Sequence, residues 1–169
     1  NSDLSNTIGN LLNRTITMSK KWFYEKIPID NTSFPDSPLK LQSEIKINEY
    51  MESFKDSNFK NSANAIIDLA NSANLYLNER APWKLIKDIE NKDIVARDIY
   101  SVLEACRIIG ILLNPLVPNL SIRILKQLKI DSSSINFQKS LQWGLLNPHN
   151  GLQDPNPVMD KIEFNENTI

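Results

Sequence analysis

The sequence is poor in residue types on which many catalytic and metal sites depend: its 169 positions hold four glycines, one cysteine and one histidine. A single cysteine, Cys106, cannot form a disulfide within the chain, and its apolar helical surroundings predict a small core residue. His149 lies in a loop rich in proline, asparagine and glycine, where we expect it at the surface. No glycine-rich phosphate loop and no cysteine pair for a metal is present. We therefore expect the chain by itself to be catalytically inactive and to hold no cofactor.

Long apolar runs and a strong net charge are also missing. No apolar run reaches transmembrane length and no signal peptide is visible, so we expect no membrane partner. The formal net charge of −1 argues against a general electrostatic attraction to nucleic acid, so we expect any such binding to rest on a local patch. The lone cysteine fits a reducing compartment, and we expect a cytoplasmic protein. The chain opens without an initiator methionine, and we expect it to be a piece of a longer protein.

What the sequence does hold is apolar residues at helical spacing, in an ordinary globular composition of 41% hydrophobic and 23% charged residues. The pattern predicts helices at 2–25, 39–55, 58–80, 83–89, 94–114 and 119–128. The second half of 94–114 is apolar nearly all round, which predicts the centre of a bundle. We therefore expect an all-α fold, a bundle of five to six helices over residues 1–130. Residues 131–169 are too rich in serine, proline and glycine for a long helix.

That C-terminal tail is nevertheless apolar at several positions, namely Trp143, Leu145, Leu146, Val158, Met159, Ile162 and Phe164. Such a composition is too apolar for free disorder. We expect a largely extended tail that packs either on the bundle or on a part of the protein outside this chain.

Residues 73–85 contain a proline that ends one helix and a tryptophan that starts the next. Pro82 lacks an N–H and cannot continue a helix, and it pushes Ala81 out of the α region. Proline suits the first turn of a new helix, so Trp83 should be fixed at a corner between two rigid elements. A tryptophan buried in the core is the alternative interpretation.

The first predicted helix carries a polar stripe beside its apolar side. Asn10, Arg14, Thr17 and Lys21 follow one another at steps of three or four residues, so they share one face. A solvated helix face is the alternative interpretation. The carboxylates are scattered along the helices, and we expect them on helix surfaces.

Four segments of the chain occur together in the order of one known family. They are Gly9-Asn10-Leu11-Leu12-Asn13-Arg14, Ala73-Asn74-Leu75-Tyr76-Leu77 running into Ala81-Pro82-Trp83, Leu112-Leu113-Asn114-Pro115-Leu116-Val117-Pro118, and Trp143-Gly144 with Gly151 and residues 157–163. With these segments the chain resembles the C-terminal anticodon-binding domain of methionyl-tRNA synthetases, which are class I aminoacyl-tRNA synthetases. The likeness covers nearly the whole chain. Val158-Met159 departs from it, because the family often has an aromatic residue there.

The resemblance implies that the helical bundle reads the CAU anticodon of methionine tRNA. The site residues that it implies are Asn10, Asn13, Arg14, Pro82, Trp83 and Lys84. Asn10 and Arg14 are expected to contact the anticodon bases, and Trp83 to stack with the splayed loop. Pro82 fixes the corner, while Asn13 and Lys84 are adjacent candidates.

The rest of the enzyme follows from the same resemblance. ATP-dependent charging of the tRNA with methionine is expected in a catalytic domain outside this chain, which also holds the ATP site and any zinc. The expected partners are thus methionine tRNA and the enzyme's own catalytic domain. We expect a monomer, because no alternating strand pattern follows Phe164.

The residue types fit this chemistry independently of the family. Sequence-specific RNA recognition mostly targets unpaired bases that stack on aromatic rings or guanidinium planes. Stacking contributes about 1–3 kcal/mol per base. Asparagine offers a donor and an acceptor to a base edge, and arginine offers a rigid fork of donors.

Two other functions remain open at this point. One is the similar bundle of another class I synthetase, such as the cysteine, leucine or valine enzyme. The other is a helical protein-interaction module whose apolar tail docks a partner. Residues 17–21, Thr-Met-Ser-Lys-Lys, partly match the Lys-Met-Ser-Lys-Ser loop that class I enzymes use near ATP, but the first lysine and the last serine are missing. We interpret residues 17–21 as part of a helix and the match as chance.

Overall fold

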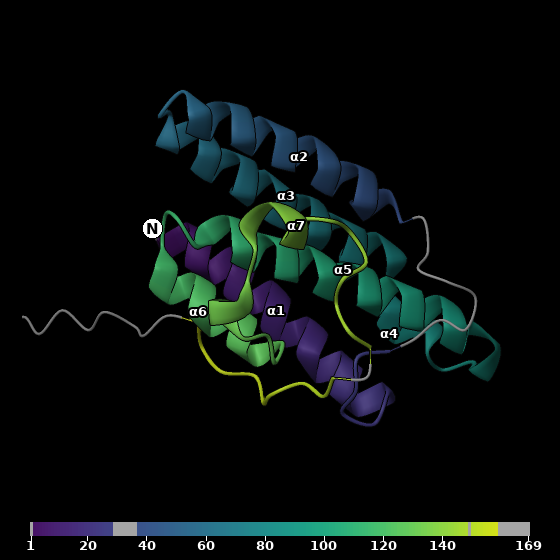
Figure 1. Ribbon diagram of the computed structural model, residues 1–169. Helices are drawn as coiled ribbons and strands as arrows, with labels where there is room; N and C mark the ends of the chain where they lie inside the picture. The colour runs from purple at the N-terminus through teal and green to yellow at the C-terminus, as the bar shows by residue number, and fades with distance from the viewer. Residues whose placement is uncertain (1, 29–36, 149, 159–169) are drawn as a thin grey trace, which may run out of the picture.

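The computed structural model describes residues 2–28, 37–148 and 150–158, and within these ranges the chain forms a helical bundle (Figure 1). In chain order the elements are α1 (Ser2–Trp22), α2 (Pro38–Lys55), α3 (Phe59–Arg80), α4 (Pro82–Leu85), the 3-10 turn η1 (Ile89–Asn91), α5 (Lys92–Leu113), α6 (Pro118–Gln127), the 3-10 turn η2 (Ser132–Ser134) and α7 (Phe137–Ser140). The β pairing of the described residues consists of an isolated bridge between Lys26 and Gly151. The predicted all-α bundle is confirmed.

Helix α5 runs through the middle of this bundle. Every residue from 98 to 113 is buried, and α1, α3 and α6 pack around the helix, while α2 packs on α3 and α5 (Figure 1). The segment with the most continuous apolar run therefore lies at the centre, as predicted. Cys106 is buried within it, and this burial raises the pKa of its thiol to about 12.

Two predicted helices are shorter in the structure. Helix α1 ends at Trp22, because Tyr24 and Glu25 adopt left-handed backbone conformations with φ of 54° and 64°. The predicted helix 83–89 is the single turn α4 followed by η1, since Asp88 takes an extended conformation with ψ of 122°. Left-handed and extended residues cannot continue a right-handed helix.

The expectation that the carboxylates lie on helix surfaces is wrong for Asp98 and Glu104, which are both buried in α5. Glu104 forms a bidentate ion pair with Arg107, whose Nε and Nη2 donate at 2.8 and 2.6 Å. The same carboxylate accepts the backbone N–H groups of residues 144, 145 and 146 at 2.7, 3.1 and 3.0 Å. Arg107 also donates to the carbonyls of Ser140 and Gln142. A buried charge is tolerated when it is paired and hydrogen-bonded in this way.

The C-terminal strap, which we define as residues 141–148 and 150–158, is also held on the bundle by the C-terminal part of α1 and the turn that follows it. The N–H of Leu152 donates to the carbonyl of Glu25 at 3.2 Å, and Asp154 pairs with Lys20. Four apolar side chains of the strap are buried, those of Leu141, Leu146, Leu152 and Val158. In Figure 1 the yellow-green strap leaves α7, passes the end of α1 and returns along the bundle toward α6.

Some expectations fall on residues outside the described ranges. These residues are His149, Met159, Ile162 and Phe164. Within the described ranges, no helix has the length and apolarity needed to cross a membrane.

Candidate nucleic-acid interface

The corner between α3 and α4 presents Trp83. Helix α3 ends at Arg80, and Ala81 takes a left-handed conformation with φ of 44° and ψ of 55°, while its N–H donates to the carbonyl of Leu77 at 3.1 Å. Pro82 is the first residue of α4 and is buried. The Ala81 carbonyl accepts the N–H of Lys84 at 2.8 Å, which closes the short turn. The predicted helix break is confirmed, and the backbone on both sides of Trp83 is tied down.

A polar cluster around the buried carboxylate of Asp98 fixes the last turns of α3 to α5 next to this corner. Asp98 accepts the hydroxyl of Tyr76 at 2.7 Å and the Nε of Arg80 at 3.0 Å with both of its oxygens. Burial, and then the hydrogen bond to Asp98, raises the pKa of Tyr76 to about 12. The hydrogen bond to Asp98 likewise raises the pKa of Arg80. Trp83 is thus presented by a rigid part of the bundle.

The Trp83 ring is not sunk in the core, because 36% of the residue is exposed. The exposed guanidinium of Arg14, on α1, lies 5.6 Å from the ring centroid. Its Nη2 donates to Oδ1 of Asn78 on α3 at 3.3 Å. A cation at this distance over an indole attracts it by about 0.5–1 kcal/mol at an exposed site. Arg14 therefore links three elements at the surface: α1, the end of α3 and the corner.

These side chains border a shallow hollow of about 400 Å³, the Trp83 hollow, which is lined by Asn13, Arg14, Thr17, Met18 and Trp83. Its volume is within the range of small-ligand sites. The Thr17 hydroxyl donates to the carbonyl of Asn13 at 2.7 Å. The side-chain oxygen of Asn13 is buried without a hydrogen-bond partner. The hollow thus combines an aromatic face, a guanidinium and an unsatisfied amide acceptor.

The residues implied by the resemblance are only partly brought together. Arg14, Trp83 and Asn13 line the same hollow. Asn10 is exposed one helical turn before Arg14 on α1, outside the residues that line it. Pro82 lies buried in the corner, and Lys84 is exposed on α4.

Sequence reasoning missed two members of this surface. Asn78, the partner of Arg14, lies on α3 within residues 73–85, so its polar character near the end of the helix was the available signal. Met18, an apolar residue next to Thr17 of the polar stripe, is half-buried and also lines the hollow.

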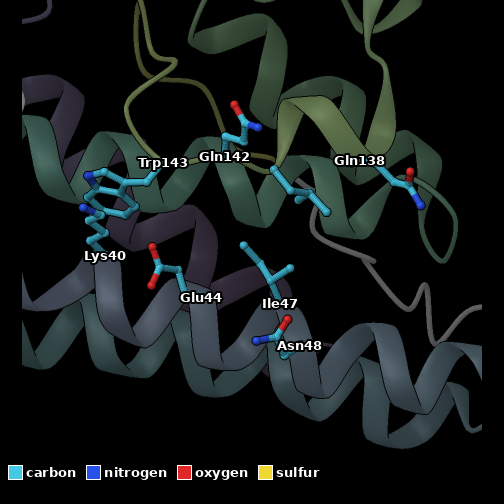
Figure 2. Close-up of a pocket in the computed structure, with 8 residues that line it drawn as sticks. Lys40, Glu44, Ile47, Asn48, Gln138, Gln142 and Trp143 are labelled. Atoms are coloured by element: carbon cyan, nitrogen blue, oxygen red, sulfur yellow. The ribbon is translucent and has the colours of Figure 1, made fainter.

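A second hollow, the α2 hollow, of about 500 Å³ lies between α2 and the region of α7 and the strap, with no residue in common with the first. The hollow is lined by Lys40, Glu44, Ile47 and Asn48 on α2 and by Gln138, Leu141, Gln142 and Trp143 opposite, and Figure 2 shows the Trp143 ring next to Lys40. The Nε1 of Trp143 is buried without a hydrogen-bond partner. Amide and charged side chains dominate this hollow, and it contains no nucleophile with a base.

Nothing in the described residues resembles a metal centre: no group of three or more histidine, cysteine, aspartate or glutamate side chains among them could hold an ion. The chemistry that the described surface offers is stacking and hydrogen bonding at the Trp83 hollow.

The chain is similar to known proteins in both sequence and fold. A family model described as the anticodon binding domain of methionyl tRNA ligase matches residues 31–168. The methionine–tRNA ligase of Synechocystis is 34% identical over 97% of this chain and 33% of its own length. The chloroplastic/mitochondrial methionine–tRNA ligase of Arabidopsis thaliana is 32% identical over 98% of this chain and 27% of its own length.

The solved structures with a similar fold are also methionyl-tRNA synthetases. The crystal structure of free-state Mycobacterium tuberculosis methionyl-tRNA synthetase matches with a TM-score of 0.83 and 25% identity, over 94% of this chain and 32% of that one. This chain therefore spans about a third of the length of the proteins that it resembles.

Proposed function

Because this chain belongs to the family of anticodon-binding domains of methionyl-tRNA ligases, we propose that it recognises the CAU anticodon of methionine tRNA within a full-length methionine–tRNA ligase. The ATP-dependent joining of methionine to the tRNA takes place in the part of that protein outside this chain. ATP, and any zinc, are bound there. The proposed partners are methionine tRNA and that catalytic part, and the proposed compartment is the cytoplasm.

One observation carries the recognition model: an exposed tryptophan ring and an arginine converge from distant parts of the chain on one hollow. An unpaired base that enters the hollow stacks on Trp83, and its edge meets polar groups of α1. Arg14 supplies a planar fork of donors, and Asn10, one turn earlier, supplies a donor and an acceptor. Buried Pro82 holds the ring in place without touching RNA.

The neighbouring candidates have narrower roles. Asn13 lines the hollow, and when its side chain turns outward its amide oxygen, which is buried without a partner in the free protein, accepts a hydrogen bond from an amino group of a base. Lys84, exposed on α4, meets a backbone phosphate as a point charge. With a net charge of −1, long-range attraction of RNA is weak, so affinity rests on these contacts and falls only modestly with salt.

The test is Trp83→Ala in the full-length enzyme, measured with RNA hairpins that carry CAU or altered loops. Loss of one stacking platform should weaken binding of the CAU hairpin about ten- to a hundredfold. ATP-dependent activation of methionine should be unchanged, because the substitution is outside the catalytic part. Trp143→Ala, in the α2 hollow, is the matched control and should keep the affinity.

Two results would contradict the proposal. If the unmodified enzyme binds CAU and altered loops equally well, the hollow does not read an anticodon. If Trp83→Ala instead lowers methionine activation or helical content, the ring supports the fold and not the RNA.

A further inference from the structure

Gly9 occupies an unusual place, the interior of α1. A glycine weakens a helix interior, because it has the greatest backbone freedom to lose. Here the position is buried, and a Cβ atom built on it would lie 2.8 Å from Cγ2 of Val158 in the C-terminal strap. Real Cβ atoms essentially never come so close to another atom. The missing side chain thus leaves a notch in α1, and Val158 fills it.

The end of the strap is held in this notch by α6. Val158 is 3% exposed, and its carbonyl accepts Nη1 of Arg123 at 3.4 Å. Gln127 makes two hydrogen bonds to Asn156: its Nε2 donates to the Asn156 carbonyl at 2.9 Å, and its Oε1 accepts the Asn156 N–H at 3.3 Å. The strap therefore joins α6 to α1 at one specific turn of α1.

We propose that the contact between Val158 and Gly9 positions Asn10 for base recognition. The inference rests on the proposed function, because it takes Asn10 as an RNA contact. Asn10 directly follows Gly9 and is exposed, whereas Val158 is buried against the preceding residue. A displacement of this turn moves the Asn10 amide, and a hydrogen bond to a base edge weakens steeply as distance and angle depart from the optimum.

Gly9 and Val158 are positioning residues and not RNA contacts, since both are buried. Their effect on RNA binding must pass through Asn10. A purely structural role predicts something different: a loss of stability that affects RNA binding equally whether or not Asn10 is present.

The experiment measures the affinity of the full-length enzyme for a CAU hairpin by fluorescence anisotropy. Gly9→Ala overpacks the contact and should weaken binding about threefold to tenfold. In an Asn10→Ala background the same change should have no further effect. Val158→Ala added to Gly9→Ala removes Cγ2, makes room for the new Cβ and should restore the affinity.

A second pair of variants keeps the test decisive if Gly9→Ala fails to fold. Val158→Ala alone leaves the notch unfilled and should weaken binding about threefold, again only when Asn10 is present. Val158→Thr keeps the branched shape but buries a hydroxyl, so it should weaken binding less than Val158→Ala does. The melting temperature of every variant is measured first, and binding is then measured below that temperature. This separates the effects on binding from unfolding.

Several outcomes overturn the proposal. It fails if Gly9→Ala weakens binding by the same factor in the unmodified enzyme and in the Asn10→Ala background. It also fails if adding Val158→Ala to Gly9→Ala does not restore the affinity. Failure of the proposed function looks different: Trp83→Ala and Asn10→Ala then leave affinity and loop preference unchanged, which removes the positioning role as well.

Discussion

Two regions of this domain treat their polar side chains in opposite ways. At the pair of Glu104 and Arg107, both carboxylate oxygens are buried and each accepts at least two hydrogen bonds. At the Trp83 hollow, the guanidinium of Arg14 is exposed over an exposed ring, and the oxygen of Asn13 has no partner. Buried polar groups that are fully satisfied make a fold specific. The guanidinium and the ring, which are both exposed, remain available to a ligand.

The largest effect is expected from breaking the satisfied region. Glu104→Gln removes the charge opposite Arg107 and turns an amide NH₂ toward backbone N–H donors. We expect a loss of about 3–5 kcal/mol in the free energy of unfolding, as for other buried pairs that lose one partner. Guanidinium titration followed by circular dichroism measures it. Glu52→Gln, on the exposed face of α2, is the control and should change stability by less than about 0.5 kcal/mol. A loss below about 1 kcal/mol for Glu104→Gln would show that the strap does not depend on this carboxylate.

A smaller effect, on binding and not on stability, is expected from the other region. Arg14→Lys keeps the charge and loses the planar fork that lies on Trp83, so we expect about tenfold weaker binding of a CAU hairpin by the full-length enzyme. The melting temperature should be unchanged. Arg97→Lys, exposed on α5, is the matched control for binding. Equal affinities of Arg14→Lys and the unmodified enzyme would mean that charge alone acts at this position.

The smallest effects on stability are expected from two tyrosine hydroxyls, one with a hydrogen-bond partner and one without. The Tyr76 hydroxyl donates to Asp98, whereas the Tyr50 hydroxyl is buried without a partner. Tyr76→Phe should therefore lower the free energy of unfolding by about 1 kcal/mol, and Tyr50→Phe should leave it unchanged or raise it slightly. Urea titration of the two variants at pH 7 measures both. Similar losses of unfolding free energy in both variants would mean that the hydrogen bond of the Tyr76 hydroxyl does not contribute to stability.

The same two tyrosines predict how stability changes at high pH. Burial raises the pKa of Tyr50 and of Tyr76 from 10.0 to about 12. Because the folded state keeps these protons after the unfolded chain has lost them, their contribution is complete below pH 10 and is lost between pH 10 and 12. Burial also raises the pKa of the Cys106 thiol from 9.0 to about 12, so the loss of stability begins near pH 9. Tyr50→Phe should reduce the slope of unfolding free energy against pH, which titrations from pH 8 to 11.5 measure.

Much of the fold could be predicted from the sequence, because helical periodicity and proline positions are local signals. The corner at Pro82 and the central place of α5 follow from such signals. The buried role of Glu104 could not, since its backbone donors lie about 40 residues away, in a segment without periodicity. The end of α1 could not be predicted, because the left-handed residues after it are Tyr24 and Glu25 and not glycine, the residue that usually marks such a turn.

The candidate site was predicted mainly through the family resemblance. The family model and the relatives are methionine–tRNA ligases, which confirms that resemblance over the cysteine, leucine and valine enzymes. Geometry adds that Arg14 and Trp83 lie together, and that Asn78 holds Arg14 across 64 positions of sequence. Direct contact of Asn10, Arg14 and Trp83 with RNA stays a prediction.

The ion pair between Lys20 and Asp154 joins positions 134 residues apart. Ribosomes make a protein from its N-terminus, so α1 emerges long before the residues that brace it. A nascent bundle that stops short of residues 150–158 leaves one flank of its first helix uncovered. Within this domain, α1 therefore acquires its final surroundings only after residues 150–158 have been made, and a chain released before that point would expose apolar surface to chaperones and proteases.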